Sequence, residues 1–315
     1  MKGTSESVTK EQWLAKIDAD LKDKARTEYY RKSLAEATIE PWYHKEDTKH
    51  DIVIPGRTLE TILLGLILDV DDLVVANKKL LNNLLGGVSA IHVCADKELS
   101  LEKLLRDVML DMITSIWEVE HASNITSHIS TSYSANSCDS TIISPASRNK
   151  VIKLTSSHHP LSDFLSQAES LVSNSVETVV CQVPFDKDYV KSICQVLAIR
   201  LLWANLCAAH GASSSARLII EGVMASAVRS DDIHQDLIVL TQVMTAMLSA
   251  DVDIACPMSP DDNEEDQRLI RQIFHLLTME GHLGKVRSPY AGSYALEKIS
   301  VDMAYNTWTT FVNNL

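Results

Sequence analysis

The stretch VETVVCQV, at residues 176–183, is apolar along nearly its whole length. A strand with one solvent-facing side alternates apolar and polar residues, whereas a strand inside a parallel sheet is covered on both faces and is apolar throughout. The stretch therefore predicts a buried strand of a parallel sheet, in which Cys181 is a small core residue.

Similar β-rich runs recur along the chain, and helical stretches lie between them. The seven further runs are IVIP (52–55), SAIHVCA (89–95), ITSIWEV (113–119), VIKL (151–154), RLIIEGV (217–223), VDIAC (252–256) and GKVR (284–287). Eight strands alternating with helices over roughly 250 residues predict an α/β fold of the (β/α)8 barrel type. The alternative is an open doubly wound sheet, but no G-x-G-x-x-G motif follows the first predicted strand.

The helical stretches have recognisable ends and faces. DDLVVANKKLLNNLLGG ends on a Gly-Gly pair typical of a C-cap. HPLSDFLSQAESLVSN places its apolar residues on one face at helical spacing. DDNEEDQRLIRQIFHLLTMEG begins with acidic residues, which the helix dipole favours.

Two segments lie outside this alternation. Residues 1–50 form a polar N-terminal arm that is predicted to be helical over EQWLAKIDADLKDKARTEYYRKSL, with the amphipathic part EQWLAKIDADLKDK, and then extended through IEPWYHKED. Residues 51–315 form the barrel domain, which ends in the helix KISVDMAYNTWTTFVNNL. Residues 121–150 are rich in Ser and Thr, which predicts a long surface loop in which ISP could add a short strand.

Composition excludes several classes of function. The chain has 315 residues, with 42 acidic against 29 basic side chains and a net charge of −13, which argues against nucleic acid as a partner. No basic amphipathic stretch suits a membrane surface, and the apolar run LETILLGLILDV is too short to span a bilayer. The first residues lack the apolar segment of a secretory signal, and six cysteines occur without a C-x-x-C pair. We therefore expect a cytoplasmic protein.

Polar residues close several predicted strands, and these are the candidate site residues because barrel active sites form at the C-terminal ends of the strands. WEVEHA contains Glu118, Glu120 and His121, and alternation sends both glutamates to one face. Four further residues extend the set. They are the pair in TSSHHP, the end of the sixth predicted strand and an arginine beyond it: His158, His159, Glu221 and Arg229. No H-E-x-x-H motif or Cys/His spacing predicts a metal site.

Two stretches carry a resemblance to a known family. VLAIRLLWANLCAAHGA (196–212), with Arg200 as the only charge in its first eleven residues, resembles the A-x-R-x-L-W-a-x-L helix of the methylmalonyl-CoA mutase family. RSPYAGSYALE (287–297) is similar to that family's D-P-x-x-G-S-y-y-x-E segment, which follows the last barrel strand. The matching positions are Pro289, Gly292, Ser293, Tyr294 and Glu297, with Ser288 in place of the usual Asp.

The resemblance extends along nearly the whole chain in order. ANKKLLNNLLGGVSAIHV is similar to the family's first barrel helix and second strand. The arm resembles the family's W…d-L-K opening and its P-x-Y-x-x-x-D step. The residues that match there are Trp13, Asp20, Leu21, Lys22, Pro41, Tyr43 and Asp47.

Three motifs of the family's catalytic chains do not occur in this sequence. They are R-G-P-Y-x-T-M-Y on the substrate side, R-T-H-C-Q-T-S-G on the sixth strand, and the D-x-H-x-x-G of the cobalamin-binding domain. The resemblance therefore implies a non-catalytic small subunit that forms a heterodimer with a catalytic large subunit, in which adenosylcobalamin is bound. This chain alone is expected to supply no catalytic residue and to bind no cofactor.

The resemblance also places the turn after the last strand at the barrel mouth. A vestigial mouth pocket would then include Tyr290 and Ser293 beside Glu118, Glu120, His158, His159, Glu221 and Arg229. The arm is expected to pack across the partner with Trp42 and Tyr43 as anchors, the alternative being an arm folded back on its own barrel.

Two other functions stay open at this point. The mouth residues could form the site of an acyl-CoA-binding protein or a reassigned enzyme, or the chain could be a catalytic barrel whose cobalamin domain is on another chain. The isolated chain could also be a homodimer without a mutase partner.

Overall fold

The computed structural model describes most of the chain. The described residues are 8–22, 32–33, 37–40, 42–48, 52–121, 125–128, 139–156, 159–211, 216–225, 228–229, 232–258 and 263–314. The barrel strands are β3 (Leu63–Asp69), β4 (Ala90–Ala95), β5 (Thr114–Val119), β6 (Ser140–Ile143), β7 (Asn149–Lys153), β8 (Thr178–Phe185), β9 (Arg217–Met224) and β10 (Ile254–Cys256). The larger barrel helices are α3 (Leu73–Leu85), α6 (Pro160–Ser173), α7 (Tyr189–Ala209), α8 (Ile233–Ser249), α9 (Glu264–His275) and α10 (Tyr294–Asn313).

The eight strands form a nearly closed (β/α)8 barrel. Their order in the sheet is β6-β5-β4-β3-β10-β9-β8-β7, and every ladder is parallel. Because β10, the last strand, pairs with β3, the first, the strands follow one another around the barrel in chain order. The predicted fold class is therefore confirmed, and the open doubly wound alternative is not the architecture of this chain.

The joint between β6 and β7 is where the barrel stays open. Residues 144–148 alone connect the two strands, and a parallel pair normally needs a crossover of about a dozen residues or more. Side chains bridge this joint in place of a ladder. Asn149 Nδ2 donates to the Ile142 carbonyl at 3.0 Å, and Lys150 Nζ donates to the Ser144 carbonyl at 3.1 Å.

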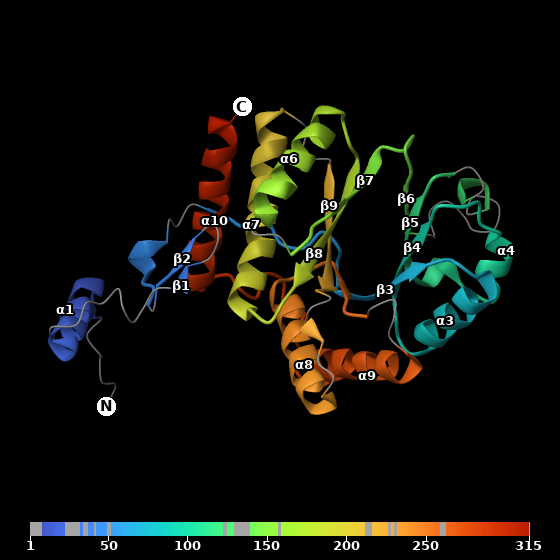
Figure 1. The fold of residues 1–315 in the computed structure, drawn as a ribbon. Coiled ribbons are helices and arrows are strands. Elements are labelled where there is room, and N and C mark those ends of the chain that lie inside the picture. Colours follow the sequence, from blue (N-terminus) through green and yellow to red (C-terminus); the bar gives the residue numbers. More distant parts are fainter. Residues whose placement is uncertain are drawn as a thin grey trace.

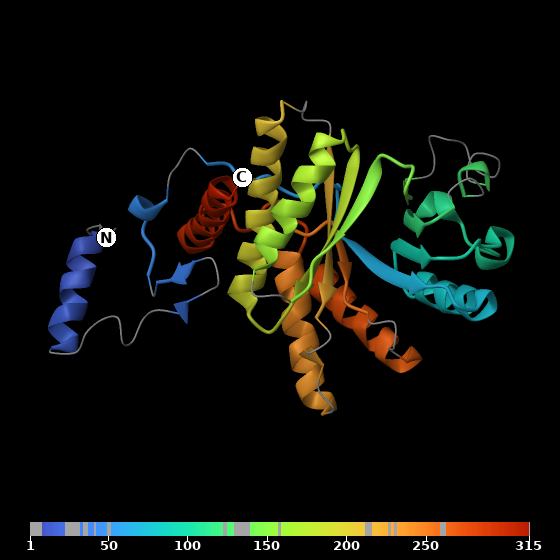
Figure 2. The same ribbon diagram turned by 45° about the horizontal axis from the view of Figure 1, so that its top comes forward.

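The helices cover the outside of the barrel in groups (Figures 1 and 2). The helices α6, α7 and α10 pack together on one side, α8 and α9 lie together, and α3 packs with the short α4 (Leu101–Leu104). Among the described helices, α7 is long and apolar enough to span a bilayer, but most of it is buried inside the protein. Its burial is continuous from Ser192 to Trp203, as in a core helix.

Apolar side chains fill the barrel interior as well as the space between strands and helices. The interior cluster is formed by Ala90, Ile116, Ile143, Val180, Ile219, Ile254 and Cys256. Gly65 on β3 belongs to this interior, since a Cβ there would lie 2.4 Å from Cys256 Sγ and 2.5 Å from the Ile254 Cγ2. The absence of a side chain at Gly65 lets β3 and β10 pair closely enough to continue the barrel.

Six of the eight predicted strands are present, and two are wrong. IVIP (52–55) and GKVR (284–287) are irregular segments with exposed valines, Val53 at 84% and Val286 at 65% exposure. Short β-branched runs of this kind carry no information on burial, so their composition misleads. The two remaining strands are β3, inside the apolar run LETILLGLILDV, and β6, within the predicted surface loop at 121–150.

The arm divides into two parts. The helix α1 (Lys10–Leu21) has no buried residue and, in Figures 1 and 2, stands beyond α10 on the side away from the barrel. The segment around β2 (Thr38–Ile39) instead packs on the protein body, with Ala37 buried and Ile39 and Tyr43 against the core. The alternative of an arm folded back on its own barrel therefore describes the segment around β2, and the packing of the arm across a partner stays a prediction.

Candidate functional site

A layer of polar side chains lies inside the barrel at the C-terminal end of its strands. Alternate residues of a strand point to the same face, so one strand can place two side chains in this layer, and five of the eight strands contribute to it. The members are His92 and Cys94 on β4, Glu118 on β5, Lys153 on β7, Gln182 on β8 and Glu221 on β9. Barrel enzymes hold their chemistry at this end of the strands.

His92 is the centre of this layer. Its ring is 1% exposed, and its Nδ1 lies 2.8 Å from the buried Glu221 carboxylate, while its Nε2 lies 3.3 Å from Glu118 Oε2. Gln182 Nε2 donates to Glu221 Oε2 at 2.9 Å and fixes that carboxylate from the other side. The imidazole is therefore held between two carboxylates that come from opposite sides of the barrel.

The carboxylates control the proton on His92. Burial alone would lower the pKa of His92, but the Glu221 charge and the contacts with Cys94, Glu118 and Glu221 outweigh it and raise that pKa well above its ordinary value. The two carboxylates therefore favour the charged form of the imidazole.

Glu118 is the partner of three groups at the open end of the layer. Lys153 Nζ lies 2.8 Å from its Oε2, and Cys94 Sγ donates to the same oxygen at 3.5 Å. Burial works against the charged form, but the bonds to His92 and Lys153 dominate and lower the pKa of Glu118 to about 2. Glu118 is consequently a carboxylate over the whole physiological range.

Two buried thiols lie near the layer without joining it: Cys256 faces the barrel interior, and Cys181 on β8 faces the helices. Burial, together with the nearby Glu221 charge, raises the pKa of both Cys181 and Cys256. Both therefore stay protonated and behave as core residues, as the sequence predicted for Cys181.

The structure brings together two of the sequence-predicted site residues. Glu118 and Glu221 both face the interior and meet through His92. Glu120 lies one residue beyond β5 and is exposed, and His159 is exposed at the start of α6. His158 lies outside the described residues.

Arg229 lies on the outer rim rather than in the layer. Its Nε donates to both Asp236 oxygens at 2.9 and 3.0 Å, and its guanidinium lies 4.0 Å from Asp266. These partners belong to α8 and α9, so Arg229 ties two helices together.

Tyr290 and Ser293 are at the other end of the barrel, which corrects their predicted place at the mouth. Tyr290 is 3% exposed and its hydroxyl donates to the Pro55 carbonyl at 3.3 Å. Ser288 N–H donates to Asp251, which precedes β10. Because GKVR is not a strand, the chain after α9 reaches the N-terminal ends of the strands, and the RSPYAGSY turn closes that end.

Two buried ion pairs complete the N-terminal end of the barrel. Arg57 pairs with Asp251, and Arg200 NH2 lies 3.1 Å from Asp253 Oδ2. Asp253 also accepts the backbone N–H groups of Leu59 and Ile220 at 2.7 and 2.9 Å. These contacts explain why a charged residue interrupts the apolar sequence of α7.

Sequence reasoning missed four members of the layer: His92, Cys94, Lys153 and Gln182. The signal was present in SAIHVCA, where His92 stands two residues before Cys94 in an otherwise apolar strand. That spacing places both on one face, and a polar pair on a buried strand needs partners. The partners themselves come from strands 26 to 129 residues further along and could not be identified by spacing.

Comparison with known proteins gives a limited result. No family model and no curated protein matches the sequence. Among solved structures, a truncated 3-deoxy-D-arabino-heptulosonate 7-phosphate synthase from Thermotoga maritima matches with 11% identity and a TM-score of 0.34, covering 80% of this chain and 93% of its own. Yersinia pestis DHPS with a pterine-sulfa conjugate matches with 13% identity and a TM-score of 0.30, covering 69% and 96%. Neither match bears on the chemistry of this chain, and its fold rests on its own strand order.

Proposed function

We propose that this chain is the non-catalytic small subunit of a cobalamin-dependent methylmalonyl-CoA mutase, a cytoplasmic isomerase, and that it stabilises the catalytic large subunit as a heterodimer. The observation that carries the proposal is the uncovered arm. Helix α1 buries none of its residues, and a helix of this length without tertiary contacts is marginal in water. A partner surface would supply the contacts that the barrel does not.

The arm has the features of an interface element. Trp13 on α1 stacks on Trp42 with ring centroids 4.5 Å apart, and Lys10 pairs with Asp47. Both tryptophans keep part of their surface exposed. Large rigid aromatics of this kind supply much of the energy of protein interfaces.

A second apolar surface lies beside the arm. A cleft of about 360 Å³ runs between the segment after the arm and α10, with Ile52, Ile54, Val301 and Tyr305 in its lining. Ile52 and Tyr305 are 38% and 66% exposed. The proposed partner covers this cleft together with α1.

The residues of the barrel interior support the assignment of the cofactor to the large subunit. No histidine occurs on β8, the sixth barrel strand, or on β9, which the sequence had numbered as the sixth. The histidine that is present, His92, is held by carboxylates on both ring nitrogens. The proposal therefore assigns adenosylcobalamin to the large subunit and derives no chemistry from it in this chain.

Co-expression with the catalytic large subunit of the same source tests the proposal. We expect a stable pair in affinity capture, and mutase activity that falls when the large subunit is purified alone. The double variant Trp13→Ala/Trp42→Ala should weaken the pair by about thirty-fold, as for a hot spot of about 2 kcal/mol. The control is Val75→Ala, an apolar position on α3 that is 66% exposed and lies outside the arm.

Two results would overturn the proposal. If the native chain forms no pair, the small-subunit assignment fails. If the pair forms but tolerates the tryptophan variant as well as it tolerates Val75→Ala, the arm is not the interface. Equilibrium sedimentation of the isolated chain gives its mass and shows whether it forms a homodimer, so self-association is not mistaken for either result.

The polar layer favours a second candidate function, an acyl-CoA-binding protein or enzyme with its site at the barrel mouth. Shifted pKa values at Glu118 and His92, inside a barrel at its C-terminal end, are typical of catalytic groups. Calorimetric titration of the isolated chain with acyl-CoA esters tests it. Saturable binding that Glu118→Gln weakens would favour this candidate, and no binding would exclude it.

A further inference from the structure

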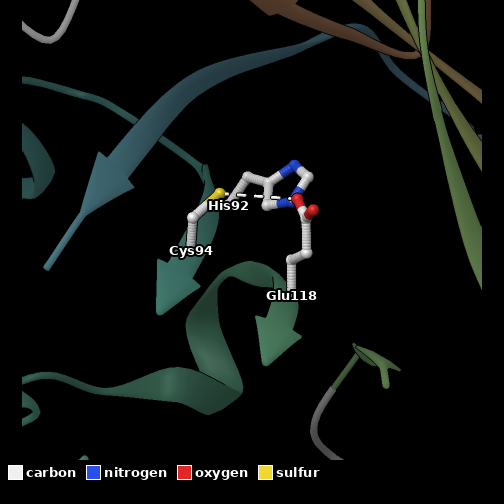
Figure 3. Close-up of side chains that lie close together, drawn as sticks. All are labelled: His92, Cys94 and Glu118. Carbon is white, nitrogen blue, oxygen red and sulfur yellow. Dashed lines mark hydrogen bonds and ion pairs between the residues drawn. The ribbon is translucent and has the colours of Figure 1, made fainter. Parts of the chain in front are cut away.

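Three potential metal ligands face one another in the polar layer, as Figure 3 shows. His92 and Cys94 project from β4 two residues apart, and Glu118 stands directly opposite Cys94 in the β4–β5 ladder. A ring nitrogen, the sulfur and a carboxylate oxygen all lie within 4.8 Å of one another. Three protein atoms at such distances can surround one ion after small side-chain rotations.

The buried imidazole supplies an independent indication. His92 Nε2 is fully buried, and its 3.3 Å contact with Glu118 Oε2 lacks hydrogen-bond geometry, so no described residue gives this buried atom a well-formed hydrogen bond. The other ring nitrogen, Nδ1, contacts the Glu221 carboxylate at 2.8 Å. Metal-binding histidines characteristically donate their second N–H to a carboxylate in this way, which orients the ring.

We propose that His92, Cys94 and Glu118 bind a zinc-class divalent cation inside the C-terminal end of the barrel, with Glu221 orienting His92. A set of one nitrogen, one sulfur and one oxygen ligand suits Zn²⁺ better than Mg²⁺ or Ca²⁺, which prefer oxygen alone. Three protein ligands leave a fourth position for water or a small ligand, as in catalytic zinc sites. The site is independent of whether the chain pairs with a mutase subunit.

Lys153 is the group that has to adjust. Its ammonium lies 2.8 Å from Glu118 Oε2 and neutralises the charge of that carboxylate. A bound cation would take over this contact with Glu118. The Lys153 side chain is 48% exposed, so it can turn toward solvent when the ion enters. Without an ion, a protonated His92 between Glu118 and Glu221 gives the same arrangement, and the experiment has to separate these two states.

Reconstitution of the full chain separates them. After chelator treatment and desalting, the protein is loaded with Zn²⁺ and the bound metal is counted by mass spectrometry. We expect one ion per chain, and with Co²⁺ a sulfur-to-cobalt charge-transfer band that reports Cys94 directly. Zn²⁺ should also protect Cys94 of the native chain from alkylation.

Matched variants make the assignment specific. Cys94→Ser should lower Zn²⁺ affinity at least ten-fold and abolish the Co²⁺ charge-transfer band, while Cys207→Ser, a cysteine outside the layer, should change neither. Circular dichroism establishes that both variants are folded. Substoichiometric zinc in the native chain, or unchanged affinity in Cys94→Ser, would show that the layer is an ion-pair network and no metal site. The alkylation test on the native chain decides the question even if Cys94→Ser fails to fold.

Discussion

At the scale of single residues, the role of Arg200 follows from its buried partners and not from the sequence motif in which it occurs. It is the only charge in the first eleven residues of the stretch 196–212, and it is 3% exposed. Its guanidinium donates to the Asp251 carbonyl at 2.8 Å and pairs with Asp253. Arg200 therefore fixes α7 to the N-terminal end of β10.

Replacing Arg200 tests this role. Arg200→Met leaves the buried Asp253 without its cationic partner, and removing one member of a buried pair costs about 3–5 kcal/mol of unfolding free energy. Chemical denaturation of the native chain and the variant measures the difference. Arg106→Ala, at an exposed pair with a 3.9 Å separation, should change the free energy by less than about 1 kcal/mol. Equal effects at both positions would contradict the role assigned to Arg200.

At the scale of elements, α1 depends on a small set of contacts to stay attached to the rest of the arm. A capping box at Thr9 begins the helix, and Lys10 pairs with Asp47 in the short 3-10 helix η1 (Lys45–Asp47). The Trp13–Trp42 stack adjoins this pair. The sequence predicted the helix correctly because its capping residue and polar composition are local, whereas its docking is not.

The pH dependence of the arm follows from Asp47. Burial would raise its pKa, but Lys10 and the His44 N–H outweigh burial and lower it below the ordinary 3.8. A carboxylate whose pKa is lowered in the folded arm stabilises that arm fully at pH values above its ordinary pKa. This contribution is lost as the pH falls through the lowered pKa. We expect acid titration to release the Trp13–Trp42 stack below pH 3.8, seen as a tryptophan fluorescence change. In Asp47→Asn the change should be absent. A transition at unchanged pH in that variant would assign it to another group.

The joint between β6 and β7 depends on side-chain hydrogen bonds instead of a strand ladder. Asn149 replaces a missing ladder there with one side-chain hydrogen bond. Asn149→Asp keeps the shape and removes the donor, so we expect a loss of about 1 kcal/mol. Hydrogen exchange should quicken at β6 and β7 and stay unchanged in the β8–β9 ladder. Uniform quickening of all strands would show that the joint unfolds only with the whole barrel.

At the scale of the whole molecule, the arm and barrel contribute unequally to stability. The barrel has its own interior and exterior cores, and α1 adds no buried residue to either. Deletion of residues 1–22 should therefore shift the melting temperature by less than about 3 °C. The same deletion should abolish the proposed pairing with a large subunit. A much larger fall in melting temperature would mean that α1 belongs to the barrel's folding unit.

The extent of successful prediction differs between fold and site. The parallel sheet was predicted because runs such as VETVVCQV are apolar on both faces, and burial on both faces is a local property of composition. IVIP and GKVR failed because four-residue runs look alike whether buried or exposed. Glu118 and Glu221 were identified from their positions late in strands, whereas Tyr290 was misplaced along with the strand that does not exist.

By itself, the sequence determined the class of the sheet, the positions of most helices and the presence of charged residues at strand ends. These follow from periodicity, capping and composition within a few turns of chain. Only the tertiary structure decided that β10 closes on β3, that the RSPYAGSY turn seals the opposite end from the polar layer, and that His92 lies between Glu118 and Glu221. These are contacts between residues distant along the chain, and barrel closure alone brings them together.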